Sequence, residues 1–291
     1  MEQNQNQNTD TNSVDQNTSD RKTRNDVPYK RDRLVRVIVQ MRNGSTSTGT
    51  GFFISKDGEI LTCAHVIAGT ELRNLKAIDF RVSNNFSTTA ESGVSVATDS
   101  SDANSKENGK DINTGAQHIK FQNYLTQSIM TLQVELPNGD RVMAEIRKID
   151  EDLDVAVLQI TKNDFEKNDT TKNGTPFFLL DDKYTPEYDE STFFCGFQMT
   201  GGYDNPTQYP FSVNRAVVSA MPETAVAGGV HEHIQLNSIN LGGNSGAPLF
   251  VEGSNTVIGI INGNLNWDKN IPLCIAYATS LKLIKEKLDI L

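Results

Sequence analysis

Short runs of apolar and β-branched residues, separated by turn sequences, make up most of the chain after residue 33. In the first half these runs lie at 34–41, 49–55, 59–67, 129–136, 141–149 and 155–160. After a polar stretch near 161–174 they resume at 191–197, 211–221, 231–239, 247–251, 256–263 and 273–280. Turn pairs such as Asn43-Gly44 and Asp57-Gly58 stand between them, as is typical of strands joined by tight connections. About six short strands in each half predict an all-β fold of two six-stranded antiparallel barrels.

A helical pattern is clear only at the end of the chain. Leu281, Ile284 and Leu288 fall on one face of a segment that otherwise carries lysines and acids. The sequence therefore predicts a first barrel at about 34–162, a second at about 175–280, and a C-terminal helix at 280–290.

Two segments lack the apolar residues that a packed core needs. Residues 1–30 are rich in Asn, Gln, Thr and Asp, and residues 84–118 are dominated by Ser, Asn, Asp, Thr, Gly and Ala. Such segments bury too little surface to offset the entropy lost on ordering. We expect a disordered N-terminal tail at 1–30 and a disordered insertion in the first barrel at 84–118.

Composition narrows the class of partner. The 291 residues carry 27 basic and 37 acidic side chains, a formal charge of −10, which disfavours binding to nucleic acid or anionic membranes. No run approaches the roughly 18 apolar residues of a spanning helix, and the first residues do not resemble a secretory leader. Three widely spaced cysteines form neither a disulfide framework nor a zinc pattern, so we expect a cytoplasmic protein.

Three short motifs carry side chains suited to nucleophilic catalysis. His65 ends an apolar run, an aspartate at 152 or 154 precedes the buried run 155–158, and Ser245 lies between glycines at 243 and 246. Each has an ordinary structural explanation when taken alone: a core histidine, a turn aspartate and a glycine-rich hairpin. Together they supply what a serine hydroxyl needs, namely a general base and a carboxylate that orients the base.

These motifs resemble the trypsin-like peptidases. The resemblance rests on four segments: Thr48–Ile54 (TGTGFFI), Leu61–Ile67 (LTCAHVI), Asp154–Leu158 (DVAVL) and Gly243–Leu249 (GNSGAPL). They are most similar to the bacterial branch that includes the protease domains of the HtrA/Deg family. The resemblance covers about residues 34–287, apart from the insertion, and implies a chymotrypsin-like double barrel over 31–290.

The resemblance also implies roles for individual residues. His65 would be the general base, Asp154 its orienting carboxylate and Ser245 the nucleophile, with the backbone N–H groups of Gly243 and Ser245 as the oxyanion hole. Asp154 is preferred over Asp152 because the family's aspartate directly precedes the apolar run. The activity implied is that of a serine endopeptidase forming an acyl-enzyme, which needs no metal and no organic cofactor.

The sequence also departs from the HtrA-like pattern. The segment Leu241-Gly242-Gly243 is one residue longer than usual, which bears on whether the oxyanion hole is preformed, and Ala247 replaces a frequent glycine. No PDZ-like region follows the final helix, so a peptide-sensing trimer is not implied. Cys63 is interpreted as a small buried strand residue.

The primary specificity pocket is expected at five residues on either side of the serine: Ile239, Asn240, Asn262, Gly263 and Asn264. None is charged, so we expect small or apolar P1 residues to be preferred over Arg or Lys. His231 and His233 share one strand face with Glu232 between them, but no further ligand lies nearby, so no metal site is predicted.

The partner expected from these observations is a protein or peptide substrate, without nucleic acid or membrane. A regulatory protein partner acting through the long loops stays open, and no oligomeric state is predicted. The main alternative is a binding or scaffold protein that keeps the fold without chemistry. An esterase-like hydrolase is disfavoured because Ser245 is not in a G-x-S-x-G elbow.

Overall fold

The computed structural model describes residues 31–69, 121, 123–199, 209–221, 223–226, 229–268 and 271–288. The tail predicted at 1–30 and the insertion predicted at 84–118 lie outside the described residues.

The first half of the chain closes into a barrel of six antiparallel strands in the order β1-β2-β3-β6-β5-β4. The strands are β1 (Leu34–Met41), β2 (Thr46–Phe53), β3 (Glu59–Thr62), β4 (Ile129–Glu135), β5 (Arg141–Asp150) and β6 (Val155–Ile160). β1 closes the ring by pairing with β4, with Val37 opposite Val134. The β-branched residues of β1 point mainly into the barrel, where such side chains pack well on a pleated surface.

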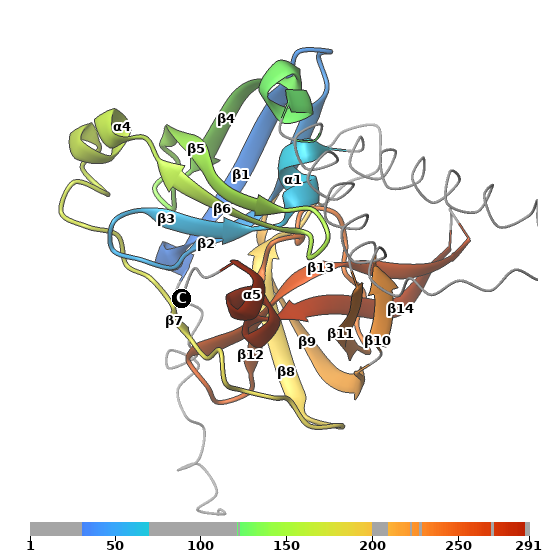
Figure 1. Ribbon diagram of the computed structural model, residues 1–291. Coiled ribbons are helices and arrows are strands. Elements are labelled where there is room, and N and C mark those ends of the chain that lie inside the picture. The colour runs from blue at the N-terminus through green and yellow to red at the C-terminus, as the bar shows by residue number, and fades with distance from the viewer. Residues whose placement is uncertain are drawn as a thin grey trace, which may run out of the picture.

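The second half forms another barrel below the first in Figure 1. Its strands are β8 (Ser191–Phe197), β9 (Phe211–Ala220), β11 (Gly229–Leu236), β12 (Pro248–Val251), β13 (Thr256–Asp268) and β14 (Ile271–Ser280). The sheet runs β11-β14-β13-β12-β8-β9, and pairing of β11 with β9 closes it. Two short strands attach outside this ring, β10 (Glu223–Val226) to β11 and β7 (Leu179–Leu180) to β13.

Helical segments are short and lie at the ends of strands. Those whose bounds lie wholly in the described residues are η2 (Arg31–Arg33), α1 (Ala64–Ala68), α4 (Lys162–Lys167) and α5 (Leu281–Leu288), and residues 123–128, directly before β4, are helical as well. α5 continues from β14 of the second barrel, and its buried residues Leu281 and Ile284 belong to the larger apolar cluster, which contains residues of both barrels. Lys148 of β5 donates from Nζ to the carbonyl of Leu288, 2.7 Å away. The helix thus ties the two barrels together.

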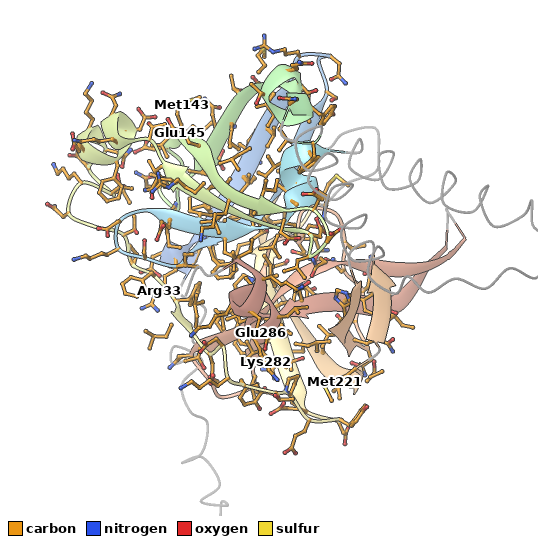
Figure 2. All side chains as sticks on the ribbon, viewed as in Figure 1. Arg33, Met143, Glu145, Met221, Lys282 and Glu286 are labelled. Atoms are coloured by element: carbon orange, nitrogen blue, oxygen red, sulfur yellow. The ribbon has the colours of Figure 1, made fainter. Side chains whose placement is uncertain are left out.

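Aromatic side chains fill the contact between the barrels. Phe178, on the connection between them, packs edge-on against Phe52 of the first barrel and Phe250 of the second, with ring centroids 6.1 and 5.1 Å apart. The guanidinium of Arg33 lies over the Phe178 ring at 5.3 Å. Figure 2 labels Arg33, the residue that directly precedes β1.

The predicted pair of six-stranded barrels with a C-terminal helix is confirmed. One local prediction was wrong: the run 59–67 is not a single strand, because the strand ends at Thr62 and α1 begins at Ala64. Ala64, Val66 and Ile67 are all buried. A continuous apolar run of this length does not distinguish a buried strand from a buried helical turn.

Candidate active site

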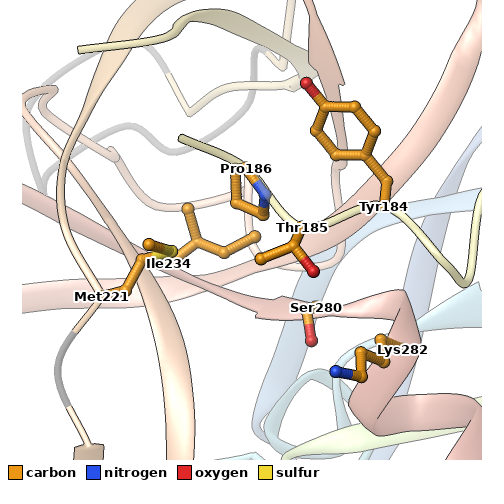
Figure 3. A pocket seen from close by; sticks show the side chains of 7 residues that line it. All are labelled: Tyr184, Thr185, Pro186, Met221, Ile234, Ser280 and Lys282. Carbon is orange, nitrogen blue, oxygen red and sulfur yellow. The ribbon is translucent and has the colours of Figure 1, made fainter. Parts of the chain in front are cut away.

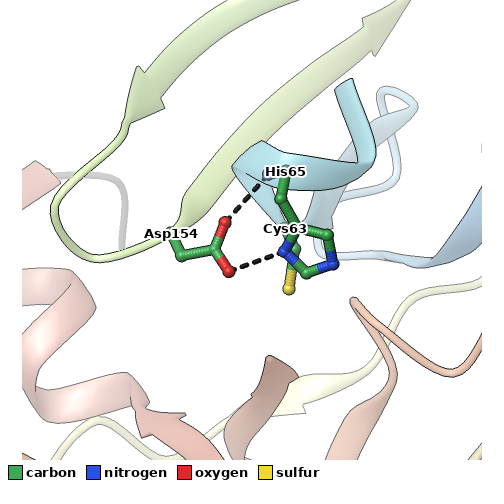
Figure 4. Close-up of side chains that lie close together, drawn as sticks. All are labelled: Cys63, His65 and Asp154. Carbon is green, nitrogen blue, oxygen red and sulfur yellow. Dashed lines mark hydrogen bonds and ion pairs between the residues drawn. The ribbon is translucent and has the colours of Figure 1, made fainter. Parts of the chain in front are cut away.

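The imidazole of His65 projects from α1 toward the carboxylate of Asp154 (Figure 4). Its Nδ1 lies 2.7 Å from Oδ2 of Asp154, and its backbone N–H donates to Oδ1 of the same carboxylate at 2.8 Å. Both side chains are about one-fifth exposed, at 19% and 21%. A carboxylate that accepts from Nδ1–H leaves Nε2 with a lone pair, the form that a general base needs.

Asp154 occupies an unusual backbone conformation in the turn between β5 and β6. Its φ is 58°, in the left-handed region that Asp and Asn enter more readily than most residues. The turn is built by the side chain of Asp150, whose Oδ1 accepts the N–H groups of Asp152 and Leu153. Of the two candidate aspartates, it is Asp154 whose carboxylate reaches His65.

Ser245 lies in a tight turn that requires glycine on both sides. Gly243 and Gly246 have φ values of 93° and 88°. A Cβ on Gly243 would lie 2.2 Å from the Phe197 carbonyl oxygen, and one on Gly246 would lie 2.0 Å from that of Thr50. No other residue fits either position without moving backbone.

Strand β13 connects the three motifs. The carbonyl of Ile261 accepts the Cys63 thiol at 3.2 Å and the Gly246 N–H at 2.8 Å. The next carbonyl, that of Asn262, accepts the Ser245 hydroxyl at 3.2 Å. Within the described part of the chain, Ser245 Oγ makes this bond and makes none to the ring of His65. The hydroxyl and the imidazole are therefore not hydrogen-bonded to each other. The seam between the barrels is marked here by Asn262, whose carbonyl accepts from Ser245 and whose Nδ2 lies 3.5 Å from the Asp154 carbonyl.

The peptide groups beside Ser245 are oriented by a contact with the segment that follows β8. The N–H of Met199 donates to the carbonyl of Gly242 at 2.7 Å. Because the peptide is trans, the N–H of Gly243 points away from Met199. Among the described residues, neither Gly243 nor Ser245 donates its N–H to a protein acceptor. Two such uncommitted N–H groups in one turn are a ready binding site for an oxyanion.

Cys63, His65 and Asp154 also form the one group of potential metal ligands found in the described residues, with ligand atoms within 4.8 Å of one another. Burial, with a smaller contribution from the Asp154 charge, raises the pKa of the Cys63 thiol well above its ordinary value. The thiol keeps its proton and donates it to Ile261. A protonated thiol is a poor metal ligand, so the chemistry of this group fits a metal badly.

The residues expected to line the specificity pocket make two kinds of contact. Asn264 pairs with the backbone of Asn240 in both directions: its Oδ1 accepts the Asn240 N–H at 2.9 Å, and its Nδ2 donates to the Asn240 carbonyl. Asn262 instead bonds to the neighbouring strand β14, where its Oδ1 accepts the Thr279 N–H at 2.9 Å. A Cβ on Gly263 would meet nothing within 4 Å. Ile239 is 43% exposed beside this pair.

The alternating histidines and a small pocket are two further features of the second barrel. The side chains of His231 and Glu232 are outside the described residues, and His233 pairs through its backbone with Thr279. A small pocket at the start of α5, lined by Tyr184, Ile234 and Lys282 among others, appears in Figure 3. It contains none of the candidate catalytic residues.

Sequence reasoning missed the contacts that hold these groups in place. Thr50 entered only as part of a glycine motif, yet it is fully buried and bonds to Gly243. Asn262 was expected to line a pocket, whereas its amide bonds to Thr279 and approaches the Leu153 carbonyl at 3.4 Å. Neither role leaves a signal in the sequence, because each depends on residues that become neighbours only in the folded chain.

Comparison with known families agrees with the fold and with the motifs. The family model described as a trypsin-like peptidase domain matches residues 49–260, which includes His65, Asp154 and Ser245. The chain therefore belongs to the trypsin-like peptidase family, a family of peptide hydrolases. A search of curated proteins found no match. Among the described residues, no helix is long and apolar enough to cross a membrane.

Proposed function

We propose that the protein is a serine endopeptidase with Ser245 as nucleophile, His65 as general base and Asp154 as the residue that orients the base. The observation that carries this proposal is the double contact of one carboxylate with His65, through the ring at 2.7 Å and the backbone at 2.8 Å. That arrangement fixes both the position and the tautomer of the imidazole. A merely structural histidine does not need it.

The proposed reaction begins when Ser245 Oγ leaves the Asn262 carbonyl and turns toward Nε2 of His65. Catalytic hydrogen bonds are often unmade before substrate arrives, so the resting contact at 3.2 Å is compatible with this step. Nε2 takes the hydroxyl proton as Oγ attacks the substrate carbonyl carbon. The protonated imidazole is stabilised by Asp154 and then gives its proton to the departing amine.

The negative charge on the tetrahedral intermediate needs donors that are already in place. We assign this role to the N–H groups of Gly243 and Ser245. The assignment is supported by the Met199–Gly242 bond and by the fact that neither N–H group has a protein acceptor among the described residues. Collapse of the intermediate leaves an acyl-Ser245 ester. Water, deprotonated by His65, then hydrolyses the ester and restores the free hydroxyl.

For specificity we propose small or apolar P1 residues. The Asn264–Asn240 bridge spans the segment before the serine, and Ile239 and Leu241 expose apolar surface on either side of it, at 43% and 42%. A peptide-library digest tests this directly. Efficient cleavage confined to sites after Arg or Lys would contradict it.

The proposed activity is tested with a fluorophosphonate probe, which phosphonylates an activated serine. We expect the wild-type protein to label at Ser245, and Ser245→Ala and His65→Ala to label at background. Ser191→Ala, which removes an exposed serine at the start of β8, is the matched control and should label like wild type. A folded wild-type protein that never labels would instead support a binding protein that keeps the fold without chemistry.

A further inference from the structure

Thr50 of β2 is a fully buried residue of the first barrel that bonds to three residues of the second. Its hydroxyl donates to the carbonyl of Gly243 at 2.7 Å and accepts the N–H of Phe197 at 2.9 Å. Its backbone N–H donates to the carbonyl of Ser245 at 2.8 Å. One side chain from the opposite barrel thus meets the turn that holds both candidate oxyanion donors.

The orientation of the Thr50 hydroxyl is fixed by its two partners. A hydroxyl has a single proton, and the Phe197 N–H occupies one lone pair, so the proton is directed to Gly243. On its other side Gly243 is held through the Gly242 carbonyl, which accepts from Met199. Both peptide groups that flank the Gly243 Cα are therefore held by hydrogen bonds, the first by Met199, in the segment that follows β8, and the second by Thr50.

We propose that the Thr50 hydroxyl is a positioning residue for the oxyanion hole, holding Gly243 so that its N–H faces the reacting carbonyl. This inference rests on the proposed function. Thr50 does not touch substrate, and it acts only through the Gly243 backbone. It also makes the hole depend on contact between the barrels, because the residue that holds the loop comes from the first barrel and the loop from the second.

Removing the hydroxyl leaves two groups unpaired in a buried place, the Gly243 carbonyl and the Phe197 N–H. A buried polar group without a partner is destabilising, so we expect the Gly243 peptide groups to rotate toward other hydrogen-bond partners. Such rotation turns the Gly243 N–H out of the hole. Full loss of one oxyanion donor lowers kcat about 10²–10³-fold, so partial misplacement should cost about 10–100-fold.

The test compares Thr50→Val, which keeps the shape and removes the hydroxyl, with Thr50→Ser, which keeps the hydroxyl. On a peptide amide that the wild type cleaves, we expect Thr50→Val to lower kcat about 10–100-fold with little change in KM, and Thr50→Ser to stay within about 3-fold of wild type. A peptide boronate, whose tetrahedral adduct places an oxygen in the hole, should lose affinity for Thr50→Val by the same factor as kcat.

Thr171→Val is the matched control for deleting a buried hydroxyl. Thr171 is fully buried and its hydroxyl donates to the Phe165 carbonyl at 2.8 Å, away from the seam. It should lose stability without losing kcat per labelled active site. If Thr50→Val does not fold, Thr50→Ala is measured in the same way, since it leaves space for water to pair with the two unpaired groups.

Two failures are distinguishable. If the wild type does not label with the fluorophosphonate, both the proposed function and the positioning role of Thr50 are wrong. If the wild type labels and Thr50→Val or Thr50→Ala keeps wild-type kcat per active site, the proposed function stands and the positioning role is overturned. Failure of Thr50→Ser to retain activity would also overturn it.

Discussion

The carboxylate of Asp154 makes two hydrogen bonds to one residue, and both need an oxygen acceptor. One oxygen accepts from the His65 backbone and the other faces Nδ1 of the ring. An asparagine at 154 would fit the left-handed backbone at φ 58°, but its amide has only one oxygen. If its NH₂ group faced the His65 backbone, two N–H donors would oppose each other. If its NH₂ group faced Nδ1, Nδ1 would have to accept and the ring proton would move to Nε2.

We therefore expect Asp154→Asn to lower kcat on the order of 10³–10⁴-fold, with the thermal midpoint changed little. The physical reason is the loss of the tautomer that leaves Nε2 free to accept a proton. Steady-state kinetics and a thermal melt check this. Asp152→Asn, two residues away, is the control and should behave like wild type; the reverse ranking of the two variants would assign the role to Asp152.

Cys195 on β8 should make the free energy of unfolding fall as the pH rises above about 9. Burial raises the pKa of its thiol from 9.0 to about 12. As the pH rises, the unfolded chain therefore loses the thiol proton before the folded chain does. The contribution of this group to the free energy of unfolding is complete below about pH 9 and is lost between about pH 9 and 12.

The loss should amount to about 1.4 kcal/mol per pH unit within that window. Urea unfolding at pH 8 and pH 10 measures it, with Cys195→Ala as the comparison because alanine has nothing to titrate. The variant is destabilised by lost packing equally at both pH values, so the comparison uses only the change in the free energy of unfolding between pH 8 and pH 10. Equal differences for wild type and variant would show that the Cys195 thiol does not contribute.

At the scale of elements, the pattern of apolar residues predicted the strands because alternation and β-branching act locally. Leu34–Met41 was predicted and found as β1 without change. The motifs of His65, Asp154 and Ser245 could likewise be located, since each combines a chemical group with a local context. The contacts of Thr50 and Asn262 could not, because they join residues 193 and 17 positions apart that meet only when the barrels close and dock.

Strand β13 also carries the residue that we expect to limit the P1 side chain. The Asn264 amide bridges to both backbone groups of Asn240, so its side chain occupies the space between β13 and the segment before Ser245. Asn264→Gly removes that bridge. We expect the ratio of kcat/KM for a P1 Phe peptide to that for a P1 Ala peptide to rise about 10-fold, because apolar pockets discriminate by size to this extent.

The matched control for this change is Asn237→Ala. Asn237 belongs to the same barrel, and its Oδ1 also accepts a backbone N–H, that of Val217 at 2.6 Å. It should leave the Phe-to-Ala ratio unchanged. A ratio that is equally unchanged in Asn264→Gly would mean that the bridge does not bound the pocket.

At the scale of the whole molecule, the candidate site exists only where the two barrels meet. His65 and Asp154 belong to the first barrel and Ser245 to the second. Phe178 is the side chain that contacts an aromatic ring of each, Phe52 and Phe250, and it is 2% exposed. Its neighbour Phe177 is 37% exposed and faces the other way along the same segment.

Phe178→Ala should therefore lower both the stability of the fold and the reactivity of Ser245. Deleting a buried phenyl ring lowers the free energy of unfolding by about 3–5 kcal/mol. Without the ring the two barrels lose packing at their contact, and the catalytic residues of each barrel are held less firmly in place. The rate of fluorophosphonate labelling per folded molecule should therefore fall as well. A misplacement of about 1 Å between catalytic groups is enough to cost on the order of 100-fold in rate.

Phe177→Ala removes the same group from an exposed position and should change neither quantity much. Urea unfolding gives the stability, and the labelling rate is measured well below the unfolding midpoint, so that both variants are folded during the measurement. A Phe178→Ala protein that is less stable yet labels at the wild-type rate would show that the barrels dock without this ring. A parallel fall in both quantities, absent in Phe177→Ala, would show that the packing between the barrels sets the geometry of the site as well as the stability of the fold.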